Sequence, residues 1–188
     1  MSRKLLEWAG VAASIALIVT GLGAIGIGIA GVNEVRDKLA QENIVGTEDS
    51  TIPGQKVDTG EEAKAFADVM RKHALESTGG LTYAEMGRFV SSADPDNPAG
   101  TSDEAAALKD ESGEPVSNGA RNIWVTETAL ATALNTSFFA ERVAFFSIAM
   151  GIMLLLTGIG FLVLVLSGVL RPSAAAAPAA QKPISATG

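Results

Sequence analysis

His73 is the only histidine in this chain and cysteine is absent, so the groups that most often bind metals or act as nucleophiles are scarce. Zinc catalysis normally takes three protein ligands rich in His or Cys. A Ser-His-Asp arrangement is conceivable because Ser and Asp are plentiful, but no nucleophile-elbow motif accompanies them. We therefore expect no catalytic residue, no cofactor and no enzymatic activity.

Oxygen-bearing side chains between Asp94 and Glu104 are the second group that could do chemistry, as ligands for a cation. A calcium-binding EF-hand loop that starts at Asp94 needs Gly at its sixth position and Glu at its twelfth. Ala99 and Ala105 occupy these positions. The sequence therefore favours a solvated acidic loop over a metal site.

A glycine motif, Gly21-Leu22-Gly23-Ala24-Ile25-Gly26, matches the GxGxxG spacing of dinucleotide-binding proteins. That fingerprint needs a preceding strand and a βαβ context. Here the glycines lie inside a long apolar run, so helix packing is the better interpretation.

Two stretches without any charged residue, 8–32 and 143–170, are the elements that must position everything else. Each exceeds the ~20 residues that a helix needs to cross hydrocarbon. The first is much longer than the roughly 7–15 apolar residues of a signal peptide, which favours an uncleaved anchor. We expect two transmembrane helices at these positions.

Charge indicates the orientation of these spans. Basic residues flank them on the side of the termini, whereas residues 33–142 contain 20 acidic and 10 basic residues. The positive-inside rule then places residues 1–7 and a disordered, proline-interrupted tail (171–188) in the cytoplasm, and residues 33–142 outside the cell membrane. The acidic segment also argues against binding to nucleic acid.

Small residues recur on one face of each apolar run, in alternating steps of four and three. In the first run this seam comprises Gly10, Ser14, Leu17, Gly21, Ala24, Gly28 and Gly31. In the second it comprises Ala140, Ala144, Ser147, Gly151, Leu154, Gly158, Phe161, Val165 and Gly168. Small residues let helices approach closely in lipid. We expect a tight antiparallel hairpin, or the use of one seam between subunits.

The same spacing continues beyond the apolar runs and predicts an outward stalk. The first seam continues through Val35 and Leu39. Traced backwards, the second would pass through Ser137, Ala133, Leu130, Thr126 and Ile123.

Capping-box patterns predict three further helices in the extracytoplasmic segment. The first opens at Thr59–Glu62 and ends at Gly79-Gly80, with an apolar stripe of Ala63, Phe66, Ala67, Met70 and Ala74. The other two are a short helix from Thr82 through Phe89 and one over Ala105–Lys109. The class is thus all-α, with a small helical domain that leans on the stalk or on a partner because its apolar content is thin.

Several segments resemble small two-pass membrane proteins of high-GC Gram-positive bacteria. They are Leu39-Ala40-Gln41-Glu42-Asn43-Ile44 with Asp49, Gly54-Gln55-Lys56-Val57, and His73-Ala74-Leu75-Glu76 through Gly79-Gly80-Leu81-Thr82-Tyr83-Ala84. The resemblance implies the two-pass topology. Such proteins are often catalogued as aromatic ring-opening dioxygenases, but the facial triad of non-haem iron needs two histidines and this chain has one.

Three functions are compatible with these features. The first is a non-enzymatic scaffold or accessory subunit that contacts the lipid bilayer and other membrane proteins or itself. The second is a homo-oligomeric channel, although Ser14 and Thr20 are the only polar side chains of the first span. The third is an envelope sensor, which would need a partner because no cytoplasmic output domain is visible.

Overall fold

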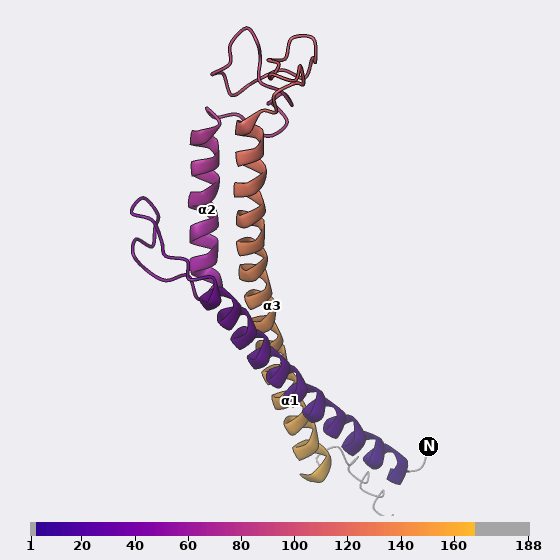
Figure 1. The fold of residues 1–188 in the computed structure, drawn as a ribbon. Coiled ribbons are helices and arrows are strands. Elements are labelled where there is room, and N and C mark those ends of the chain that lie inside the picture. Colours follow the sequence, from indigo (N-terminus) through magenta and orange to yellow (C-terminus); the bar gives the residue numbers. More distant parts are fainter. Residues whose placement is uncertain (1–2, 168–188) are drawn as a thin grey trace, which may run out of the picture. The chain divides into compact units, whose positions relative to one another are not determined.

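Three helices, and no strand, make up the regular structure of residues 3–167, the part of the chain that this computed structural model describes. They are α1 (Arg3–Gln41), α2 (Gly60–Ser77) and α3 (Gly119–Ser167) (Figure 1). The expected all-α class is confirmed. The chain divides into two compact units, one made of residues up to 23 and from 151 onward, the other of residues 24–150. Helices α1 and α3 each contribute to both units.

Helices α1 and α3 are the two elements that are long and apolar enough to cross a membrane, judged by length and composition within the described residues. Both helices extend beyond their charge-free runs. Helix α1 continues from Val32 to Gln41, and α3 begins at Gly119, well before Val143. The end of the second run and the expected tail (171–188) lie outside the described residues.

Helix α2 forms where its capping signal predicts it. The Thr59 hydroxyl accepts a hydrogen bond from the Glu62 N–H, and the Glu62 carboxylate accepts one from the Thr59 N–H. This reciprocal pair satisfies donors that the first helical turn cannot satisfy itself. At the other end Gly79 and Gly80 have positive φ, and the Gly80 N–H donates to the Leu75 carbonyl at 2.7 Å, which ends the helix.

The two other helices expected from capping boxes do not form, so those predictions are wrong. The Thr82 and Glu85 groups are hydrogen-bonded as in a box, yet residues 82–89 contain one turn and no helix, and residues 105–109 contain no helix either. Isolated backbone bridges hold the loop instead: Phe89 pairs with Thr101 and with Ser117, and Ser91 pairs with Ala107. Helices this short are marginal by themselves, and the Phe89 and Leu108 N–H groups donate instead to the Thr101 and Val90 carbonyls across the loop.

The core of the second unit lies where α2 packs against α1 and α3. Its buried members come from α1, the 42–59 loop, α2 and α3, and they are Leu39, Val57, Ala63, Phe66, Ala67, Val69, Ala131 and Leu134. A second cluster, Ala74, Met86 and Trp124, lies between the far end of α2 and the first turns of α3. Figure 1 shows α2 beside the N-terminal half of α3. The amphipathic stripe of α2 thus faces helices that continue into the apolar runs.

The backward extension of the second seam is wrong by one residue in register. Ile123 and Leu130 are 43% and 38% exposed, whereas Trp124, Ala131 and Leu134 are buried. The reason is a change of neighbour, because the N-terminal half of α3 packs against α2 while residues 144–148 pack against α1. The buried face of α3 therefore rotates along the helix, and one face cannot be extrapolated through that change.

Candidate functional site

In the unit formed by residues 24–150, small residues bring the backbones of α1 and α3 close together. A Cβ added at Gly28 would lie 2.7 Å from the Ala144 carbonyl oxygen, closer than real Cβ atoms approach. A Cβ on Gly31 would lie 3.3 Å from the Ala144 methyl. The Ser147 hydroxyl donates to the Ala24 carbonyl at 3.0 Å. Five of the residues named from the sequence, Ala24, Gly28, Gly31, Ala144 and Ser147, thus lie in one contact.

The other unit contains an equivalent contact. A Cβ on Gly21 would lie 2.7 Å from the Gly151 carbonyl oxygen, and one on Gly158 would lie 2.9 Å from the Ser14 carbonyl oxygen. Gly10 faces the Val165 side chain. The buried Ser14 hydroxyl donates to its own helix, at the Gly10 carbonyl, so no polar group is left unpaired there. Gly168 lies outside the described residues.

Not every glycine of α1 takes part in such a contact. Gly23 and Gly26 have no atom within 4 Å of an added Cβ, although they belong to the same GxGxxG match as Gly21. The whole match lies within the helix α1, without the strand that a dinucleotide site requires. Of the three glycines in the match, only Gly21 meets α3.

Glu141 joins all three helices and was not recognised from the sequence. The residue is 4% exposed, on α3 next to the second apolar run. One carboxylate oxygen accepts from Arg36 Nε of α1 at 2.7 Å, and the other accepts from the Gly60 N–H at 3.0 Å. Gly60 opens α2, where unpaired N–H groups and the helix dipole favour an anion. The carboxylate is therefore paired with a guanidinium and a helix N-terminus.

Close packing at Gly60 is part of this junction. A Cβ there would lie 2.7 Å from the Glu141 carboxylate and 3.0 Å from the Phe138 Cα, so a larger residue would push α2 away from α3. An ion pair between Glu61 and Arg142 links the same two helices beside it. A signal was present in the sequence, because Glu141 is the only acidic residue after Glu127. Its partners could not be read from the sequence, since Gly60 and Arg36 are 81 and 105 residues away.

The single histidine belongs to a clasp that holds the 42–59 loop to α2. Asp49 Oδ2 accepts from Lys72 Nζ at 2.9 Å and lies 3.0 Å from His73 Nε2. The Lys72 ammonium is the largest influence that lowers the pKa of the Asp49 carboxyl far below its usual range. The same contact raises the pKa of Lys72. This arrangement uses His73 as a structural hydrogen-bond partner at a partly exposed site.

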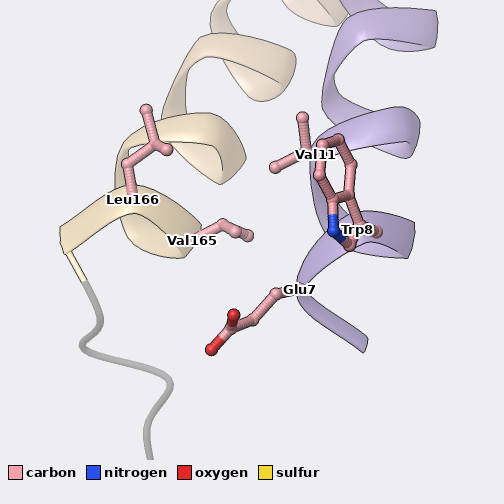
Figure 2. Close-up of a pocket in the computed structure, with 5 residues that line it drawn as sticks. All are labelled: Glu7, Trp8, Val11, Val165 and Leu166. Atoms are coloured by element: carbon pink, nitrogen blue, oxygen red, sulfur yellow. The ribbon is translucent and has the colours of Figure 1, made fainter. Parts of the chain in front are cut away.

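A pocket of about 430 Å³ lies in the unit that contains the N-terminal part of α1 and the C-terminal part of α3, near the N-terminus of α1 (Figure 2). Its lining is Glu7, Trp8, Val11, Val165 and Leu166, so the only ionisable side chain is one carboxylate. Such a lining suits an apolar chain better than a reacting group. Within residues 3–167 no three His, Asp or Glu side chains are placed to hold a metal ion.

Comparison with known proteins yields no relative from which a role could be transferred. No protein-family profile matches the sequence, and no curated protein or solved structure is similar to it. The helix contacts and the Glu141 junction are therefore the features of the chain that bear on its function.

Proposed function

We propose that the chain is a two-pass integral membrane protein that acts as a scaffold or accessory subunit of a membrane complex, without enzymatic activity of its own. In this proposal α1 and α3 cross the cell membrane as an antiparallel hairpin with residues 1–7 and the tail from 171 in the cytoplasm. Residues 33–142 lie outside, where the extended helices form a stalk that carries α2 and the loops.

The observation that supports this proposal best is the backbone-to-backbone approach of α1 and α3 at Gly21, Gly28 and Gly158. In lipid the hydrophobic effect does not drive helices together. Dispersion contacts drive their association, and these contacts are closest where no side chain separates the two backbones. Most apolar side chains of both runs, such as Ile27, Met153 and Leu166, point away from these contacts and are exposed, as lipid-facing residues would be.

The Glu141 junction supports a scaffolding role for the segment outside the membrane. It fixes the N-terminus of α2 to α1 and α3 just beyond the apolar runs. The core of that segment includes Leu39, Ala131 and Leu134 from the same two helices. An outer part so attached would present a fixed surface to partners at a constant height above the bilayer.

Single cysteines test the topology, because the chain contains none. Asn97→Cys should react with a membrane-impermeant maleimide in intact cells, whereas Lys4→Cys should react only after permeabilisation. The reverse pattern, or equal labelling of the two variants, would show that the proposed orientation is wrong.

Native mass spectrometry of protein extracted in mild detergent tests the role. We expect a complex whose mass contains other polypeptides besides copies of this 19.3 kDa chain. Extraction as a lone monomer, with no neighbouring protein captured by crosslinking in native membranes, would overturn the accessory role.

A sensor that acts through a partner is the second candidate, and Glu141 favours it because one carboxylate contacts both α1 and the start of α2. A ligand that moved α2 would then strain the α1–α3 contact. If the position of α2 is coupled to the α1–α3 contact, Glu141→Gln should increase hydrogen exchange in α1 around Gly28 as well as in α2. Faster exchange in α2 alone would exclude this coupling.

A further inference from the structure

One face of α3 is exposed in the second unit but carries no charge. The centre of this face consists of small and polar residues, and four larger apolar residues flank it. We call these ten residues the uncharged α3 face: Asn122, Thr126, Ala129, Ala133, Thr136 and Ala140 at the centre, with Ile123, Val125, Leu130 and Phe139 beside them. All ten are exposed, Phe139 by 67%. Glu127 is the only charged residue between 122 and 140, and it is partly buried outside this face.

Helix α2, which lies beside this part of α3 in Figure 1, shows what a solvated face of this protein looks like. Its exposed positions include Glu61, Asp68, Arg71, Lys72 and Glu76. A helix face in water is normally charged or polar, as on α2. The contrast indicates that the uncharged α3 face is covered in the working protein.

The hydroxyl groups near this face do not need water. Thr126 donates to the Asn122 carbonyl at 3.0 Å, Thr132 to the Thr128 carbonyl at 2.7 Å and Thr136 to the Thr132 carbonyl at 2.8 Å. Each hydroxyl donor is thus satisfied within α3. The threonines can be buried against another helix without leaving an unpaired donor, which would otherwise cost about 1–3 kcal/mol each.

We infer that a second copy of this chain covers the uncharged α3 face, so that two α3 helices pack side by side and parallel. This inference rests on the proposed function, because insertion in one membrane orients both copies the same way and holds them at the same height. Across a two-fold axis parallel to the helices, each residue meets its own counterpart or a near neighbour of it. Ala129, Ala133 and Ala140 would let the two backbones approach closely.

Charge selects a second copy over an unrelated partner. Residues 33–142 carry 20 acidic and 10 basic residues, so the net charge of this segment makes two copies repel each other. A face without charges adds nothing to that repulsion when it contacts its own counterpart. A different protein that bound this acidic segment would gain from basic residues placed against the acidic surface, and the uncharged α3 face offers it no charge to recognise.

Disulfide formation between single cysteines in native membranes tests this inference. Ala129→Cys and Ala133→Cys should form a dimer of twice the chain mass on mild oxidation. The matched control is Asn135→Cys, since this exposed residue of α3 points ~120° away from Ala129 and ~160° away from Ala133. Asp68→Cys on α2 is the second control. Because a disulfide needs Cα atoms within ~7 Å, we expect roughly tenfold lower yields at both control positions.

A charge on the same face provides the second measurement. Ala133→Glu should abolish the Ala129→Cys crosslink through repulsion between the copies, while external labelling of Asn97→Cys in the same background reports that the chain still inserts. Equal yields at all four positions, no crosslink at 129 and 133, or crosslinks only to a protein of another mass would each overturn self-association. If one of these three outcomes is found while Asn97→Cys is labelled from outside and other polypeptides co-purify, the proposed function stands and the inferred self-association fails. Loss of the external labelling would instead count against the proposed topology.

Discussion

At the scale of single residues, the carboxylate of Glu141 on α3 connects α1 and α2. This carboxylate is almost fully buried, which is costly unless every lone pair that faces the protein has a donor. Arg36 and the Gly60 N–H supply those donors. Glu141 therefore stabilises the junction of the three helices, and a substitution that removes its charge should destabilise that junction.

We predict that Glu141→Gln destabilises the protein by about 1–3 kcal/mol, because the Arg36 guanidinium loses its carboxylate and the buried amide cannot serve both donors equally well. Thermal unfolding in detergent, followed by circular dichroism, measures this loss. Glu34→Gln is the matched control, since that side chain is 71% exposed and pairs only with Lys38. Equal melting temperatures for the two variants would contradict the importance of the junction.

The glycines of α1 supply an internal comparison. Gly21→Ala and Gly28→Ala place a methyl against backbone atoms of α3, and we expect each to cost about 1–3 kcal/mol. Gly23→Ala and Gly26→Ala meet nothing within 4 Å and should be neutral or slightly stabilising, since alanine favours helix. Unfolding by titration with SDS separates the two pairs. If all four variants behave alike, the close contact between α1 and α3 is not formed as described.

At the scale of elements, α2 and the 42–59 loop behave as one piece. The helix is capped by Thr59 and Glu62, and the loop is tied to its middle by Asp49. Because the capping box lies within four consecutive residues, α2 was predictable from sequence alone. The clasp joins residues more than twenty positions apart, so it was not.

The clasp should respond to acid with a defined sign. Contact with Lys72 lowers the folded-state pKa of Asp49, so its contribution is fully present above the usual carboxyl pKa of ~3.9 and is lost as pH falls towards the lowered value. We predict that the loop amides around Gly46 and Ile52 lose protection against exchange, relative to their intrinsic exchange rates, below about pH 4.

Asp49→Asn should show the faster loop exchange already at neutral pH and should lose most of this acid dependence. Exchange measured by mass spectrometry between pH 6 and pH 2, corrected at each pH for the intrinsic exchange rate, tests both statements. A variant that keeps the wild-type acid response would show that another carboxyl group controls the loop.

At the scale of the whole molecule, α2 and its flanking loops have no core without the parts of α1 and α3 that extend beyond the apolar runs. The main cluster takes Leu39 from α1 and Ala131 and Leu134 from α3. We therefore predict that a fragment of residues 43–118 does not fold, since α2 would lose most of the apolar surface that it packs against and short helices are marginal in water.

Circular dichroism and NMR shifts of this fragment measure the prediction, with the full chain in detergent as the reference for α2. A fragment with a stable helix over residues 60–77 and dispersed signals would show that α2 and its loops form an independent domain. In that case the contacts with α1 and α3 would be docking contacts rather than the source of the fold.

The sequence by itself determined the all-α class, the two long apolar helices and α2 with its caps, because composition, periodicity and capping act within a few neighbouring residues. Only the tertiary structure decided which face of α3 is buried, where Glu141 finds its partners and how residues 82–118 are held. These depend on which helix lies beside which, and on contacts between residues 105 and 123 positions apart. Periodicity shows that a helix has an apolar face. Where a helix packs against different neighbours along its length, however, the buried face rotates around the helix at the point where the neighbour changes.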